Sequence, residues 1–211
     1  MGVDLWWYLE VNAFARQTPW LHDVFAAYAL WGGLVVLTGM LVAGYLVGRR
    51  RDRSVPMVSA VVCAGVGTVV ALLVNQDLIS PAVGRARPCQ VLSHVEVLLT
   101  CAHDYSFPSD HCVLAGAFVA GLAFLGVRWA VPAAAVALLL AFTRVYTGVH
   151  YPSDAAAGLV MGVVIGVVVV VVARPAVRRL ADRMAGTRLH PLVAAHPAPV
   201  QTVETVEPQH R

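Results

Sequence analysis

Two histidines lie in short polar segments of an otherwise apolar chain. The imidazoles of His111 and His150 titrate near neutrality and can act as nucleophiles, acids or bases. Asp154 follows His150 by four residues, close enough to accept the ring N–H and to fix the tautomer. The pattern predicts a nucleophile candidate, an acid candidate and a carboxylate that orients an imidazole.

Groups that bind anions accompany both histidines. Arg87 and Arg144 carry guanidinium forks that match the geometry of phosphate oxygens. Pro-Ser-Asp occurs at 108–110 and at 152–154, each time before an apolar run, so two helices are expected to begin there. Helix N-termini also favour anions. These residues predict phosphoryl transfer without a metal or other cofactor, and no Cys/His spacing resembles a zinc site.

Each feature has a simpler structural explanation when it is taken alone. An Arg beside a membrane helix usually anchors that helix, which accounts for Arg85. Loop histidines such as His94 and His103 are usually solvated, and Pro-Ser-Asp is usually only a helix cap. The three motifs together, rather than any one of them, indicate a catalytic site.

The composition is that of a membrane protein. Hydrophobic residues make up 59% of the 211 residues, charged residues make up 13%, and the mean hydropathy is +0.72. Soluble domains contain about 25% charged residues. The sequence therefore excludes a disordered chain, a coiled coil, a nucleic-acid-binding arm and an ordinary soluble enzyme. We expect a membrane as partner and no nucleic acid.

Uncharged segments predict an all-α, polytopic membrane bundle with five full spans and an N-terminal interfacial or partial-span helix. The spans are expected at 24–48, 55–76, 112–127, 129–143 and 155–173. The third and fourth reach spanning length only if 111–128 and 130–148 are helical, because a helix rises about 1.5 Å per residue. The run 163–173 has no polar face, which excludes a soluble helical bundle.

Arginine positions predict the orientation. They cluster between the first two expected spans, between the third and fourth, and after the fifth. Because successive spans cross in opposite directions, these three places lie on the same side of the membrane. The positive-inside rule assigns that side to the cytoplasm. The N-terminus and the loops at 77–110 and 144–154, which hold every motif, then face outward.

The expected domain organisation has three parts. Residues 1–23 form an amphipathic segment at the outer interface or, alternatively, a helix packed on the bundle. Residues 24–185 form the membrane domain. Residues 186–211 are rich in Pro, His and Thr without an apolar period, and are expected to form a disordered cytoplasmic tail.

The motifs resemble those of the type 2 phosphatidic acid phosphatase family. Its pattern is Lys-(six)-Arg-Pro, then Pro-Ser-Gly-His, then Ser-Arg-(five)-His-(three)-Asp, and the match covers roughly 75–158. The resemblance implies that His150 takes the phosphoryl group and that Asp154 orients it. His111 would protonate the leaving oxygen and then activate water. Three residues would hold the phosphate oxygens: Arg87, Arg144 and Ser109.

Three positions depart from the family pattern. Ser80 replaces the Lys, and Arg85 is expected to supply the missing charge at the phosphate. Asp110 replaces the Gly before His111, where its charge would modulate the site and raise the pKa of His111 if it lies close. Thr143 replaces the Ser but keeps a hydroxyl.

The missing Lys and the Pro-Ser-Asp-His sequence are similar to the bacitracin-resistance type of undecaprenyl diphosphatase. That resemblance implies hydrolysis of the terminal phosphate of an undecaprenyl or decaprenyl diphosphate at the outer face of a bacterial plasma membrane. Phosphatidic acid, phosphatidylglycerol phosphate or a polyprenyl-phosphosugar would suit the same pocket, and a lipid phosphotransferase would use the same chemistry. A channel is disfavoured because the spans contain no ionisable residue at their middle.

Two of the four cysteines lie in the first outward loop. Cys89 and Cys101 are twelve residues apart, on the side that is expected to be oxidising. We predict a disulfide between them that fixes the segment between the first two motifs. Two free thiols in a flexible loop are the alternative.

Overall fold

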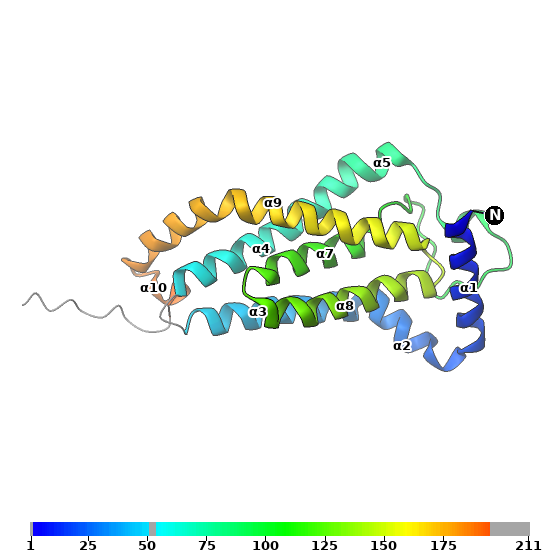
Figure 1. Cartoon of the computed structure of the whole chain (residues 1–211), viewed down its shortest axis with the longest axis horizontal. Helices are drawn as coiled ribbons and strands as arrows, with labels where there is room; N and C mark the ends of the chain where they lie inside the picture. Colours follow the sequence, from blue (N-terminus) through cyan, green and yellow to red (C-terminus); the bar gives the residue numbers. More distant parts are fainter. Residues whose placement is uncertain (1, 51–53, 195–211) are drawn as a thin grey trace, which may run out of the picture.

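The computed structural model describes residues 2–50 and 54–194, and within these ranges every regular element is a helix. The predicted all-α bundle is therefore confirmed (Figure 1). The long axis of the bundle is formed by α3 (Gly33–Gly48), α4 (Ser54–Val74), α7 (Asp110–Ala123), α8 (Val127–Tyr146) and α9 (Pro152–Ala185). Short elements complete it: η1 (Pro19–Leu21), α2 (His22–Ala27), η2 (Tyr28–Gly32), η3 (Asn75–Ile79), α5 (Ser80–Val83) and α6 (Pro88–Val91).

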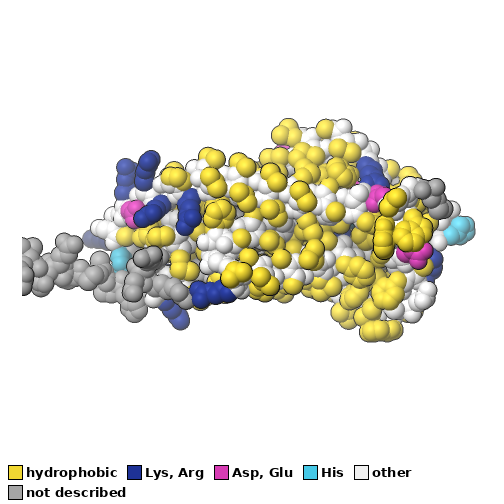
Figure 2. Space-filling view, viewed as in Figure 1, with side chains coloured by type: hydrophobic (Ala, Val, Ile, Leu, Met, Phe, Trp, Pro, Cys, Tyr) yellow, Lys and Arg dark blue, Asp and Glu magenta, His cyan; other side chains and the backbone are white. Residues whose placement is uncertain are grey.

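In the described part of the chain, four helical stretches are long and apolar enough to cross a membrane, which makes the chain a multi-pass membrane protein. They are Pro19–Gly48, Ser54–Val91, Val127–Tyr146 and Pro152–Ala185. Their apolar side chains cover the middle of the surface seen in Figure 2, as lipid contact requires. The third predicted span differs, because the structure has a helix of only 14 residues there, Asp110–Ala123.

The short helix α7 ends before the expected 111–128 because the chain turns at Gly126, which has φ of +120°. At about 1.5 Å per residue, α7 is roughly 21 Å long. It packs against α4, α8 and α9, and most of its side chains are buried. Its role is therefore that of a central helix around which the longer helices are arranged.

Close packing of α7 on α9 brings the two Pro-Ser-Asp segments together. A Cβ on Gly162 would overlap the Val113 carbonyl, so only glycine permits this approach. Both helices begin at the same end of the bundle, where the Ser109 N–H donates to the Asp154 carbonyl at 3.1 Å. The fold thus places 108–111 beside 150–154.

The N-terminal helix α1 (Val3–Gln17) lies across this end of the bundle (Figure 1). Its Tyr8 hydroxyl donates to the Gly148 carbonyl at 3.2 Å, and its Asn12 side chain donates to the Glu96 carbonyl at 2.7 Å. Trp6 and Trp7 remain about half exposed on its outer side. These contacts match the alternative of a helix packed on the bundle.

At the opposite end, the described chain continues beyond the tail boundary expected at residue 186. Helix α10 (His190–Val193) packs against α4 and α9. The Tyr45 hydroxyl donates to the Leu192 carbonyl at 2.7 Å, and Val193 is buried. Packing of this short apolar segment explains the later boundary. Residues 195–211 of the predicted tail lie outside the described residues.

Candidate active site

The predicted histidines and arginines meet in one cavity of about 280 Å³ at the end of the bundle that carries α1. The start of α7, the end of α8, the turn η2 and the loops before α7 and α9 supply its walls. Its lining consists of Leu30, Arg87, Leu99, Thr100, Ala102, Asp104, Asp110, His111, Arg144, Val149 and His150. Segments separated by more than 100 residues in sequence therefore form one polar pocket.

His150 is only 1% exposed and is held by hydrogen bonds at both ring nitrogens. Its Nε2 accepts N–H groups from Arg87 at 2.9 Å and from Arg144 at 3.1 Å. Its Nδ1 lies 2.9 Å from the Ser106 carbonyl. Since guanidinium groups only donate and carbonyls only accept, the proton must be on Nδ1. The lone pair of Nε2 therefore points at the two arginines.

The electrostatic environment keeps His150 neutral. Burial, followed by the charges of Arg144 and Arg87, lowers the pKa of His150 to about 3, although Asp154 acts in the opposite direction. A neutral imidazole has a free lone pair, so His150 meets the first requirement of a nucleophile at neutral pH.

A glycine allows the loop before His150 to reach this position. Gly148 has φ of +80°, and a Cβ there would overlap the Glu96 carbonyl. Its conformation and its close approach both exclude other residues without strain. The turn between α8 and α9 consequently directs His150 into the cavity.

Asp154 lies beside His150, but it does not make the direct hydrogen bond that the spacing predicts. The closest carboxylate oxygen is 3.7 Å from His150 Nδ1, whose N–H donates a hydrogen bond to the Ser106 carbonyl instead. The same Asp154 oxygen accepts the Ser106 hydroxyl and, at 2.8 Å, the Tyr151 N–H. Ser106 thus connects the two residues, and no sequence pattern pointed to it.

His111 begins α7 and forms another wall of the cavity. Its Nε2–H donates to the Leu30 carbonyl of the π-helical turn η2 at 3.2 Å. Burial, followed by the charge of Arg144, lowers the pKa of His111 to about 4. Asp110 raises the pKa as predicted, but burial and Arg144 outweigh it, so the net shift of the His111 pKa is downward.

Asp110 is held at the rim of the cavity by two amide side chains. Asn75 donates to one carboxylate oxygen at 2.6 Å, and Gln76 donates to the other at 2.9 Å. Both amides come from the second π-helical turn, η3. Their contacts fix the carboxylate next to His111 and spread its charge.

Two buried arginines supply the positive charge of the cavity. Arg87 and Arg144 are each 6% exposed. Arg87 Nε donates to Asp104 at 2.8 Å, a carboxylate that the sequence did not single out. The Nε of Arg144 and the hydroxyl of Ser109 have no hydrogen-bond partner in the described part of the chain. Buried donors without partners cost stability, so they are typical of a site that receives an anionic ligand.

A family comparison agrees with this geometry. The model of the PAP2 superfamily matches residues 59–178, more than half of the chain. The chain belongs to the PAP2 superfamily. The resemblance inferred from the motifs is therefore confirmed, and His111, Arg87, Arg144, His150 and Asp154 all lie within the matched range of this superfamily domain.

Curated relatives of this PAP2 chain fall into two groups. A lipid A 1-phosphatase of Rhizobium etli is 41% identical over 44% of this chain and 41% of its own length. The undecaprenyl-diphosphatase of Bacillus subtilis is 32% identical over 60% of this chain and 62% of its own length. The chain thus spans between about two fifths and three fifths of these relatives.

Solved structures share the PAP2 fold. LpxE from Aquifex aeolicus has a TM-score of 0.59 at 22% identity, and the match covers 80% of this chain and 95% of that one. A PAP2-type phosphatidylglycerolphosphate phosphatase from Bacillus subtilis has a TM-score of 0.52 at 20% identity, covering 76% and 82%. At these identities the likeness concerns the fold.

Arg85 does not occupy the position expected for a substitute of the PAP2 lysine. Its guanidinium lies behind Asp154, where it donates to Asp154 at 2.7 Å and to Asp4 at 2.6 Å. It also stacks on the Tyr151 ring at 3.9 Å. With these contacts, Arg85 is not part of the cavity lining, and its predicted role at the phosphate is corrected.

The loop between the first two PAP2 motifs is closed by the predicted disulfide. Cys89 and Cys101 are bonded, which confirms the pairing. Leu99, Thr100 and Ala102 of the closed loop line the cavity. The disulfide therefore constrains one wall of the cavity.

Proposed function

We propose that this protein is a lipid phosphatase that removes the terminal phosphate of a polyprenyl diphosphate through a phosphohistidine intermediate. One observation carries the proposal: two buried guanidinium groups donate to the unprotonated Nε2 of His150 at the wall of a cavity that also contains His111. This arrangement combines a neutral nucleophile with charges that bind an anion.

The first chemical step forms the phosphohistidine. Arg87 and Arg144 turn from Nε2 to the phosphate oxygens, and the Nε2 lone pair of His150 attacks the terminal phosphorus. The bond from phosphorus to the leaving oxygen breaks, and His111 gives that oxygen a proton. The imidazole becomes positively charged, which the Ser106 carbonyl and the nearby Asp154 carboxylate stabilise.

The second step returns the enzyme to its starting state. His111, now neutral, takes a proton from water, and the water oxygen attacks phosphorus. The N–P bond breaks, inorganic phosphate leaves, and His150 regains its lone pair. Ser109, the N-cap of α7, has a buried hydroxyl without a partner among the described residues, but it does not line the cavity itself.

The surroundings suit a lipid substrate at the outer membrane face. Leu30 and Leu99 add apolar walls to the charged cavity. Arg174, Arg178 and Arg179 lie toward the end of α9 that is remote from the cavity, where Figure 2 shows Lys/Arg side chains gathered. The positive-inside rule supports a cytoplasmic location for that end and for the C-terminal tail.

A second substrate candidate is a lipid A-type 1-phosphate, since two Rhizobium relatives bear the name lipid A 1-phosphatase. The two candidates differ in the bond that is broken. Hydrolysis of a polyprenyl diphosphate breaks a phosphoanhydride, whereas hydrolysis of lipid A breaks a phosphate ester at a sugar.

Phosphate release from a panel of purified lipids in detergent tests these candidates. The panel contains undecaprenyl diphosphate, lipid A, phosphatidic acid and phosphatidylglycerol phosphate. His150→Ala should abolish release, while His94→Asn, at an exposed histidine outside the cavity lining, should not. Release by the wild-type protein from lipid A but not from undecaprenyl diphosphate would reject the polyprenyl assignment. Release by His150→Ala at the wild-type rate would reject the mechanism.

Labelled phosphate gives an independent test of the intermediate. A phosphohistidine is labile to acid and stable to alkali, so the label should follow this pattern on the wild-type protein and be missing from His150→Ala. Transfer of the labelled phosphate to a second lipid, instead of its release as inorganic phosphate, would indicate a phosphotransferase.

A further inference from the structure

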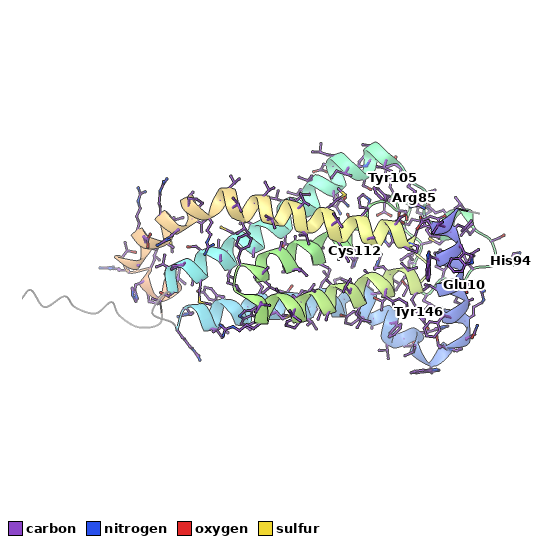
Figure 3. All side chains as sticks on the ribbon, in the orientation of Figure 1. Glu10, Arg85, His94, Tyr105, Cys112 and Tyr146 are labelled. Carbon is purple, nitrogen blue, oxygen red and sulfur yellow. A yellow bond between two sulfur atoms is a disulfide. The ribbon has the colours of Figure 1, made fainter. Side chains whose placement is uncertain are left out.

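The N-terminal helix contributes a charged side chain to a network behind the candidate nucleophile. Asp4, in the first turn of α1, accepts Arg85 Nη2 at 2.6 Å. Its other oxygen accepts the Ser153 N–H at 2.9 Å, near the start of α9. Figure 3 labels Arg85 at this end of the bundle, next to α1 and α9. Three segments that are far apart in sequence meet at these contacts.

Arg85 connects Asp4 to Asp154. Its Nη1 lies 2.7 Å from Asp154 and 2.7 Å from the Ser153 hydroxyl, and its guanidinium stacks on Tyr151. A guanidinium group stays protonated at any ordinary pH, so the cation persists between these carboxylates. The geometry leaves Arg85 little freedom.

The buried carboxylate of Asp154 needs this cation. Its side chain is fully buried, and a buried charge without a partner is strongly destabilising. Arg85 accounts for one of its oxygens, while Ser106 and the Tyr151 N–H account for the other. The Ser106 carbonyl also accepts the hydrogen bond from His150 Nδ1–H. Movement of Asp154 must therefore shift Ser106 and, through it, the His150 ring.

We propose that Asp4 and Arg85 are positioning residues, through which the docked N-terminal helix holds Asp154, Ser106 and thereby His150 in the reactive arrangement. The proposal rests on the phosphatase function proposed above. Neither residue lines the cavity, so neither contacts the substrate. Their loss should therefore lower kcat and leave KM nearly unchanged, because Arg87 and Arg144 still bind the phosphate.

Steady-state kinetics of four variants provide the first test. Arg85→Met should lower kcat about 100-fold and Asp4→Asn about tenfold, since small displacements of reacting groups have effects of this size. Arg85→Lys should retain an intermediate rate. Glu10→Gln is the matched control, because Glu10 is exposed on the same helix and undergoes the same change of carboxylate to amide.

Chemical rescue separates positioning from folding. Arg85→Ala removes the guanidinium group and leaves space for it, so millimolar guanidinium should restore part of kcat, whereas sodium at the same ionic strength should not. Loss of thermal stability with kcat unchanged in Asp4→Asn and Arg85→Met would overturn the proposal, because α1 would then serve packing only.

A measurement without turnover keeps this inference distinct from the proposed function. Nitrogen NMR of His150 reports its tautomer and titration in wild-type and Arg85→Met protein. Removing the cation leaves the Asp154 charge uncompensated, so the pKa of His150 should rise from about 3. An unchanged titration would overturn the proposal even if no lipid were hydrolysed, whereas a shifted titration in a protein inactive on every lipid would reject the proposed function alone.

Discussion

The two Pro-Ser-Asp segments have the same sequence but are used differently. At 108–110, Ser109 is the N-cap of α7, so Asp110 is the first helical residue. At 152–154, the proline itself is the first helical residue, and Asp154 is the third. A shift of two positions turns a side chain by about 200° around a helix of 3.6 residues per turn.

This difference in register gives the two aspartates different surroundings. In α9 the third position lets Asp154 reach back to the N–H of the N-cap Tyr151, which buries it next to His150. In α7 the first position leaves Asp110 at the rim of the cavity with Asn75. Identical tripeptides thus produce a buried carboxylate beside His150 in one helix and a partly exposed carboxylate in the other.

The largest effect that bears on this comparison is expected from the histidine next to Asp110. His111→Asn should lower the rate about 10²–10⁴-fold, the usual contribution of general acid–base catalysis. The loss should be greatest for poor leaving groups, which depend most on protonation. Rates with a series of phosphate esters measure this; equal losses for good and poor leaving groups would contradict the role of His111 as acid.

The matched change in α9 should have the next largest effect. Asp154→Asn removes the charge that faces the imidazolium, and we expect a loss of about 100-fold in kcat. The Ser106 carbonyl still holds the His150 proton, which limits the loss. In contrast, Asp110→Asn should change kcat no more than about threefold, because Asp110 affects His111 less than burial and Arg144 do. Equal losses of kcat in Asp154→Asn and Asp110→Asn would contradict the different roles proposed for the starts of α9 and α7.

The pH dependence sharpens the assignment of the acid. In the free enzyme the pKa of His111 is about 4, so the protonated fraction, and with it kcat/KM, should fall as the pH rises above that value. A bound phosphate offsets Arg87 and Arg144, which raises the pKa of His111 in the complex and extends kcat to higher pH. His111→Asn, measured alongside, accounts for ionisation of the substrate. If kcat and kcat/KM decreased over the same range of alkaline pH, the result would contradict this prediction.

The smallest effect is expected from the loop that closes the cavity. Replacing Cys89 and Cys101 by Ser should lower stability by about 3 kcal/mol in the chain-entropy model. It should raise KM more than it lowers kcat, because Leu99 and Thr100 line the cavity without touching His150. Thermal unfolding and kinetics under oxidising and reducing conditions measure both effects; a wild-type protein insensitive to reductant would contradict them.

The sequence by itself determined the class of this protein and the identity of most of its site. Long uncharged runs predict membrane helices because the bilayer excludes charge. The residue types and spacing of Arg87, His111, Arg144 and His150 predict a phosphate site with two imidazoles. The structure brings these four residues to one cavity.

Tertiary structure decided which groups complete the site. The short α7, the bond from His150 to Ser106 and the place of Arg85 between Asp4 and Asp154 depend on how separate helices pack. No local sequence pattern encodes such contacts, because the residues that contact the end of one helix depend on where the other helices pack. The same reason explains why one Pro-Ser-Asp places its carboxylate beside His150 and the other does not.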